Sequence, residues 1–180
     1  MRIILMVLIT ALMVAISSTT NAAQDVTLLG AYKWLGTQDY DTPDRYALIQ
    51  SGIKHSKSMK VDPTLTISVM AVESGFNPRA KSKHGALGSM QVVPKYHRDK
   101  LKGKRLLTVN DGAQVGVSIL RDCKLKQKHP TKSNILQCYC GYKGEPLRKY
   151  QRDVMAKYKQ IKIAQSSLVQ MSKRNRLSLN

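Results

Sequence analysis

Residues 61–74, VDPTLTISVMAVES, predict a helix with almost no polar face. Asp62 is a residue type that favours the N-cap, and Pro63 suits the first helical position. Apolar side chains surround the predicted helix, on one stripe and on much of the remaining surface: Leu65, Val69, Val72, Ile67, Met70 and Ala71. Because a helix that is apolar on nearly every side is a buried one, the other elements must pack around this segment.

The rest of the chain also shows helical rather than alternating patterns. We expect an amphipathic helix from Asp44 to about Met59, another over 110–127, and a short one capped by Ser133 and broken by Gly141 and Gly144. A further helix carries its apolar residues on one face: Leu147, Tyr150, Val154, Tyr158 and Ile161. The predicted fold is therefore mainly α, in one helical domain over residues 45–163.

The two ends of the chain differ from this domain. Arg2 precedes an apolar run from Ile3 to Ile16, which is shorter than the ~18 residues that a membrane span usually needs. Small residues follow, so we predict a cleaved signal peptide over 1–23, no stable membrane anchor after cleavage, and export to the periplasm or cell envelope. Residues 24–44 form a turn-rich N-terminal extension with Trp34 as a packing anchor, and 164–180 form a basic, frayed tail.

Three cysteines, Cys123, Cys138 and Cys140, are expected to form one disulfide in an oxidising compartment. Helical neighbours two residues apart point to different faces, so Cys138 and Cys140 cannot easily pair. We predict Cys123–Cys138, with Cys123–Cys140 as the second choice. The four histidines show no ligand-like spacing to the cysteines, so neither a metal site nor a cofactor is predicted.

Glu73 is an unusual residue at the end of the buried helix, which Ser74-Gly75 terminates. The negative end of the helix dipole and the apolar neighbours both disfavour a carboxylate and should raise the pKa of Glu73. A carboxylic acid that stays protonated near neutral pH is what general-acid cleavage of a glycosidic bond requires. The alternative is a solvated glutamate at a frayed helix end.

The segment ESGFNPRAKSKHGALGSMQ resembles the catalytic stretch of the lytic transglycosylases with a goose-type-lysozyme-like fold. The family pattern and this chain share these residues at the same spacing: Glu73-Ser74, Asn77-Pro78, Ser82, Gly85-Ala86, Gly88 and Met90-Gln91. CYCGY stands where the family has Ala-Tyr-Asn-Ala-Gly, and YQRDVMAKY resembles its closing helix. The resemblance covers roughly residues 45–160 and implies a lysozyme-like domain with a substrate cleft.

The resemblance also implies roles for individual residues. Glu73 would be the general acid and then the base, and Ser82 would contact the N-acetyl group of a sugar. Met90 and Gln91 would line the cleft, and Gly88 would let the backbone approach the glycan. Tyr139 and Tyr150 would orient the sugar and Glu73, although for each tyrosine a core role is as good an interpretation. Cys140 replaces the family's asparagine, and Ser89 stands where leucine is usual.

One carboxyl group is sufficient for this chemistry. Between Glu73 and Asp99 the chain has no second acidic residue, whereas ordinary glycosidases use two carboxyl groups. The resemblance, with which a single carboxyl group agrees, implies a peptidoglycan lytic transglycosylase that cleaves the MurNAc–GlcNAc β-1,4 bond and forms 1,6-anhydroMurNAc. The net charge of +19, from 30 basic and 11 acidic residues, suits glycan strands that carry carboxylates.

The sequence leaves two alternative functions open and disfavours a third. A muramidase on the same fold would hydrolyse the bond, and a non-catalytic peptidoglycan-binding protein would only hold the strand. A basic nucleic-acid-binding protein is disfavoured, because aromatic residues make up 6% and no specific nucleic-acid module is recognised. The biological setting, whether a secretion system, a pilus, a conjugation apparatus or a phage, is also left open by the sequence.

Overall fold

The computed structural model describes residues 26–177, so the predicted signal peptide lies outside the described residues. The chain forms these helices in order: α2 (Arg45–Ser58), α3 (Pro63–Ser74), α4 (Val109–Leu125), α5 (Lys132–Cys140) and α6 (Gly144–Leu177). Two 3₁₀ turns, η1 (Pro94–Tyr96) and η2 (Arg98–Lys100), lie in the long connection before α4. Within residues 26–177 extended pairing is limited to isolated bridges, so the predicted mainly α fold is confirmed.

Helix α3 has the predicted ends. The Asp62 carboxylate accepts hydrogen bonds from the amides of Thr64 (2.9 Å) and Leu65 (3.4 Å), with Pro63 at the first helical position. Gly75 closes the helix in the left-handed conformation, with φ +58°. These caps place Glu73 in the last turn.

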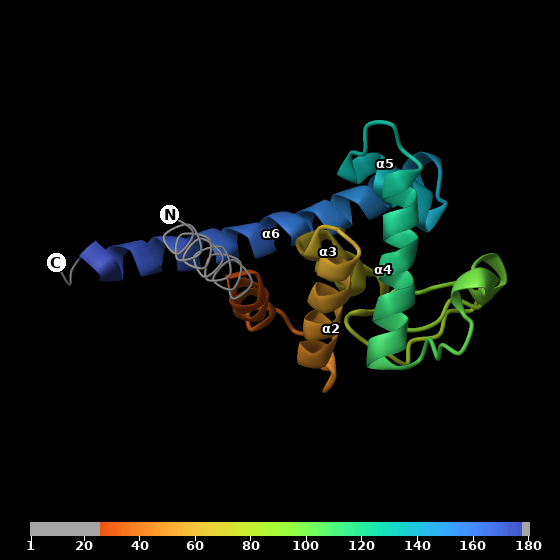
Figure 1. Cartoon of the computed structure of the whole chain (residues 1–180), viewed down its shortest axis with the longest axis horizontal. Coiled ribbons are helices and arrows are strands. Elements are labelled where there is room, and N and C mark those ends of the chain that lie inside the picture. Colours follow the sequence, from red (N-terminus) through yellow and green to blue (C-terminus); the bar gives the residue numbers. More distant parts are fainter. Residues whose placement is uncertain (1–25, 178–180) are drawn as a thin grey trace, which may run out of the picture.

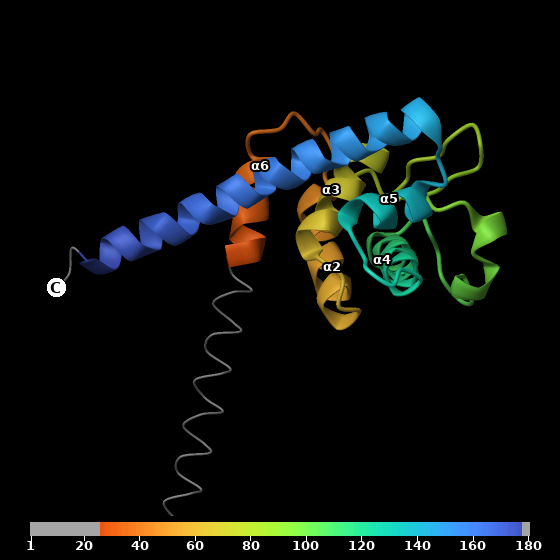
Figure 2. The same cartoon turned by 90° about the horizontal axis from the view of Figure 1, so that it is seen from above.

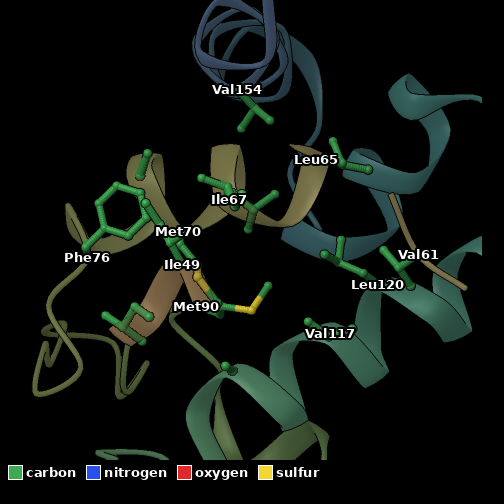
Figure 3. Packing of buried hydrophobic residues seen from close by; sticks show 14 of the residues in the cluster. Ile49, Val61, Leu65, Ile67, Met70, Phe76, Met90, Val117, Leu120 and Val154 are labelled. Carbon is green, nitrogen blue, oxygen red and sulfur yellow. The ribbon is translucent and has the colours of Figure 1, made fainter. Parts of the chain in front are cut away.

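Helix α3 lies at the centre of the packing. It packs against α2 and α6, while α4 packs against α2 and α5. Figures 1 and 2 both show α6 crossing over the shorter helices, with its C-terminal part projecting beyond them. Figure 3 shows the apolar side chains of α3 meeting those of its neighbours, with Ile67, Met70, Leu120 and Val154 among them.

The hydroxyl groups of α3 are buried without being left unpaired. The Ser68 hydroxyl donates to the Thr64 carbonyl at 2.7 Å, and the Ser56 hydroxyl donates to Thr66 at 2.7 Å. Gln165 of α6 donates to the Thr64 hydroxyl at 3.2 Å. Because a buried polar group is costly only when it lacks a hydrogen-bond partner, these residues are compatible with a helix enclosed on all sides.

The two flanking segments differ from the sequence-based expectation. Residues 26–35 are helical rather than turn-rich, and α6 continues to Leu177 rather than fraying after Gln165. The two helices stabilise each other, because Trp34 is buried and its indole N–H donates to Gln160 at 3.0 Å. Trp34 is the expected packing anchor, but its partner lies 126 residues along the chain. No local pattern could reveal that contact.

The cap of α5 also differs. Thr131, not Ser133, is the N-cap, and its hydroxyl accepts from the Asn134 amide at 3.3 Å while Asn134 accepts from the Thr131 amide at 2.8 Å. This reciprocal capping box satisfies two amides at once, which a cap at Ser133 would not do.

The predicted disulfide is confirmed: Cys123 of α4 is bonded to Cys138 of α5, with the two Cα atoms 5.6 Å apart. Cys140 is the free cysteine among the described residues. The bond joins two helices that are adjacent in sequence, and it fixes the start of the segment that carries Tyr139 and Cys140.

Removing this disulfide should destabilise the domain. In a Cys123→Ala/Cys138→Ala variant, closure of the intervening loop no longer restricts the unfolded chain, and the free energy of unfolding should fall by about 3 kcal/mol. Urea unfolding without reductant measures the change. A Cys140→Ala variant is the control and should keep the wild-type midpoint. Three free thiols in the unreduced wild type would contradict the assignment.

Candidate active site

The Glu73 side chain is bonded to a tyrosine that is distant in the sequence. The Tyr150 hydroxyl, on α6, donates to Oε1 of Glu73 at 2.6 Å. The next residue, Ser74, donates to the Ser89 carbonyl at 2.8 Å. The end of α3 is thereby bonded to α6 on one side and to the following loop on the other.

The electrostatic environment of Glu73 matches the sequence-based argument. Burial raises the pKa of its carboxyl to about 7, and the hydrogen bond from Tyr150 opposes that rise only in part. Glu73 is therefore not a solvated residue at a frayed helix end. With a pKa near neutrality, the same group can deliver a proton and then accept one.

Glu73 opens into a pocket of about 530 Å³. The walls come from the end of α3, the loop over residues 82–93, the turn at Tyr96 and His97, Ile119 of α4, and residues 138–142 at the end of α5. Glu73 is the one carboxyl-bearing residue on these walls. Within residues 26–177, no cluster of histidine, cysteine and acidic residues could hold a metal ion.

A second hollow, of about 450 Å³, lies beside the start of α3 and includes Asp62. That carboxylate caps α3 and accepts a hydrogen bond from Tyr158 at 2.8 Å. Because Asp62 is committed to these structural bonds, the pocket at Glu73 is the stronger candidate for chemistry.

The loop after α3 is built by turns that the sequence pattern indicated. Ser82 lies on the pocket wall, and its hydroxyl accepts from the amides of His84 (3.3 Å) and Ala86 (3.0 Å). Gly88 has φ +76°, and a Cβ there would collide with the Leu106 carbonyl oxygen. Gly88 is thus needed for close packing of the loop against residue 106, and it is absent from the pocket wall.

Met90 and Gln91 take different directions. The Met90 side chain is fully buried in the core, against Gly116, and does not line the pocket. Gln91 does line it, and its amide donates to the Gly88 carbonyl at 3.0 Å. The backbone of Met90 still matters to the site, because its carbonyl accepts the Tyr139 hydroxyl at 2.7 Å.

The two tyrosines proposed from the sequence both lie near Glu73. Tyr139 lies on the pocket wall, and burial raises the pKa of its hydroxyl well above the usual value. Tyr150 is buried behind the carboxylate, and burial likewise raises its pKa. Both hydroxyls therefore remain protonated donors at neutral pH. Both tyrosines pack into the fold, Tyr150 is bonded to Glu73 and Tyr139 lies on the pocket wall, so their contact with a sugar stays a prediction.

Cys140 also faces the pocket. Its sulfur accepts the Tyr142 amide at 3.4 Å, and burial raises the pKa of the thiol. The thiol is neutral, so it adds no charge beside Glu73. Sequence reasoning missed four polar or aromatic side chains on this wall: His84, Tyr96, His97 and Tyr142. The signal that could have found two of them is a tyrosine close to a turn-forming residue: Tyr142 directly follows Gly141, and Tyr96 is two residues after Pro94.

Comparison with known proteins agrees with this geometry. Residues 50–163 match the Transglycosylase SLT domain family. This is more than half of the chain, and the chain therefore belongs to that family. The match contains α3, the loop, the disulfide and Tyr150.

Curated relatives are similar over a shorter segment. The protein matches "Membrane-bound lytic murein transglycosylase C" of Actinobacillus pleuropneumoniae serotype 5b (strain L20) with 48% identity over 42 residues. The proteins of the same name from serotype 3 (strain JL03) and serotype 7 (strain AP76) match equally. Each match covers 23% of this chain and 12% of the relative, so it concerns only a small part of those proteins.

Glu73 should make stability depend on pH in a specific direction. Its pKa rises from 4.5 to about 7 on folding, so the folded state binds the proton more tightly and loses stability as pH rises between these values. A Glu73→Gln variant cannot ionise. It should gain at most about 3 kcal/mol over wild type at pH 8 and almost nothing at pH 4.

Urea unfolding of both proteins at pH 4 and pH 8 checks this prediction. An equal gain at the two pH values would show that the carboxyl is not held in its neutral form by the fold. Glu145→Gln is the control, because Glu145 is exposed and paired with Arg148 and Arg152.

Proposed function

We propose that this protein is a peptidoglycan lytic transglycosylase, which cleaves the MurNAc–GlcNAc β-1,4 bond and leaves a 1,6-anhydroMurNAc end. The observation that carries the proposal is Glu73: one carboxyl on the wall of a 530 Å³ pocket, with its pKa raised to about 7. Membership of the Transglycosylase SLT domain family supports the same reaction.

The reaction needs one group that changes its role. In the first step the protonated Glu73 gives its proton to the bridging oxygen, and the bond to C1 of the muramic sugar breaks. The acetamido group of that sugar stabilises the positive charge at C1. In the second step the Glu73 carboxylate takes the proton of the C6 hydroxyl, and that oxygen bonds to C1. The proton lost in the first step is recovered, and no water is consumed.

The surrounding residues have roles that fit this sequence of steps. The Tyr150 hydrogen bond holds Oε1 of Glu73 in place and stabilises the carboxylate formed between the steps. Ser82 and Gln91, both on the pocket wall, would contact the acetamido group and the sugar hydroxyls. Gly88, Met90 and Tyr139 act indirectly, because they hold in place the loop that carries Ser82 and Gln91.

We further propose that the protein works in the periplasm or cell envelope. A disulfide joins Cys123 and Cys138, and such bonds persist in oxidising compartments. The apolar N-terminal run supports export, and the similar proteins of Actinobacillus pleuropneumoniae are named as membrane-bound. Among residues 26–177, no helix is long and apolar enough to cross a membrane. Secretion systems, pili, conjugation machinery and phages all remain suitable settings.

Glu73→Gln should abolish cleavage and leave binding intact. Glutamine keeps the shape and accepts the Tyr150 hydrogen bond but cannot deliver a proton. General acid–base assistance contributes about 10²–10⁴-fold, and one group here serves both steps, so the loss should reach the upper end. Digestion of purified peptidoglycan followed by mass analysis measures it, with Glu145→Gln as the control that keeps wild-type activity.

The products separate the proposed reaction from its rivals. The wild type should release anhydro products, one water lighter than hydrolysed ones. Hydrolysed products would indicate a muramidase, and binding without cleavage would indicate a non-catalytic protein. If Glu73→Gln retains more than about a tenth of wild-type activity, Glu73 is not the acid.

Replacing Cys140 by asparagine should hold or raise activity. The thiol is a weak hydrogen-bonding group, whereas the asparagine amide supplies two donors and an acceptor. The amide oxygen could accept the Tyr142 amide that the sulfur now accepts. Steady-state rates on peptidoglycan check the outcome, with the thermal midpoint measured alongside. A tenfold loss of activity at an unchanged midpoint would show that the thiol itself is required.

A further inference from the structure

Tyr96 is a large aromatic side chain that the proposed chemistry leaves without a role. It is 69% exposed and lies on the wall of the Glu73 pocket. An exposed aromatic residue inside a pocket is more informative than one on open surface, because a ligand can cover it. The position is fixed by the 3₁₀ turn η1, which Pro94 begins.

The other exposed tyrosine on this wall differs from Tyr96. Tyr142 is 51% exposed, but its ring packs edge-on against Tyr150, with centroids 5.9 Å apart. Its amide is also bonded to Cys140. Tyr142 therefore supports the residue that orients Glu73. Tyr96 has no aromatic partner among the described residues, and its ring contacts a cationic side chain instead.

That cation is Lys95. Its ammonium lies 4.8 Å from the centroid of the Tyr96 ring. Within residues 26–177, Lys95 forms no ion pair. The nearest acidic residue along the chain, Asp99, is paired with Lys100 at 3.4 Å. An aromatic ring and an uncompensated positive charge are thus held together beside the catalytic pocket.

We propose that Tyr96 and Lys95 select an acidic glycan, an inference that rests on the proposed function of this pocket. Tyr96 packs against the apolar C–H face of a sugar ring in the bound strand, and Lys95 contacts a carboxylate carried by that strand. The carboxylate belongs either to the lactyl group of a muramic sugar or to a stem peptide. A neutral β-1,4-linked N-acetylglucosamine oligomer offers the sugar face without the charge.

The two contacts should separate by ligand. Stacking uses the ring face of any sugar in the strand, so it contributes to affinity for neutral and acidic glycans alike. The ammonium discriminates between them, because specificity is a difference between two affinities. Its contribution should also weaken as ionic strength rises, since exposed charges are screened by salt.

Binding measured in the Glu73→Gln background, where strands stay uncut, tests this assignment. The probes are glycan strands with stem peptides, strands from which the peptides have been removed, and a neutral N-acetylglucosamine hexamer. Tyr96→Ala should weaken all three about tenfold, and Tyr96→Phe should restore the affinity. Lys95→Gln should weaken acidic strands about two- to fivefold at low salt and leave the hexamer unchanged.

The arms of the experiment identify the carboxylate. A stem peptide is attached through the lactyl carboxyl, so only a peptide-free strand carries a free lactyl carboxylate. A loss confined to strands with stem peptides therefore assigns the contact to a peptide carboxylate, a loss confined to peptide-free strands assigns it to the lactyl group, and a loss on both shows that Lys95 contacts either carboxylate. Lys102→Gln is the matched control, because Lys102 is an exposed lysine on the same connection that, unlike Lys95, makes no cation–π contact with Tyr96. It should bind all three probes as the parent does.

Two results would overturn the proposal. One is Tyr96→Ala binding within twofold of the parent at an unchanged thermal midpoint. The other is Lys95→Gln losing as much affinity for the hexamer as for acidic strands. The proposed reaction is tested separately, by cleavage of peptidoglycan with the wild type. If the protein binds the probes as expected but the wild type releases no product, the proposed reaction is wrong and the binding assignment is supported.

Discussion

The hydrogen bond between Tyr150 and Glu73 is the contact on which the site depends. It joins the end of α3 to α6 across 77 residues of sequence, at 2.6 Å. The carboxyl also needs α3 to be enclosed, because burial is what raises its pKa to about 7 against the lowering effect of this hydrogen bond. A solvated Glu73 would ionise at ordinary acidity and could not act as an acid at neutral pH. Burying this carboxyl also costs stability above its ordinary pKa, as is common where function needs an unfavourable environment.

Some residues of the loop after α3 face the pocket at Glu73, and others determine the shape of the loop. Ser82 and Gln91 lie on the wall, whereas Gly88 and Met90 face inward. Both inward residues are constrained by close packing: Gly88 lies against the Leu106 carbonyl, and Met90 lies against Gly116. A family motif therefore mixes two kinds of requirement, and its spacing alone does not separate them.

The segments outside the family match support the part of the chain that carries Glu73. Residues 26–35 pack against α6 on both sides of residue 163: Trp34 bonds to Gln160 within the family match, and Lys33 bonds to Ser167 beyond it. Gln165 of the same extension reaches the start of α3. Helix α6 is thus held near its beginning by the bond from Tyr150 to Glu73 and in its middle by Gln160, Gln165 and Ser167, while its C-terminal part projects beyond the other helices.

The sequence by itself determined the elements whose signals are local. Neighbouring residues and their periodicity predict the caps and enclosure of α3, the helices α2 and α4, and the turn glycines. They also predict that the pKa of Glu73 is raised. Helix geometry excluded a bond between Cys138 and Cys140, and of the two pairings that it left the structure has the preferred one, Cys123–Cys138. The tertiary structure decided what depends on distant contacts: the helical state of residues 26–35, the length of α6, the inward turn of Met90 and the place of Tyr96 on the pocket wall. Packing partners that are distant in the chain determine whether a marginal helix forms and which way a side chain points. The local sequence pattern does not identify those partners, so it could not predict these features.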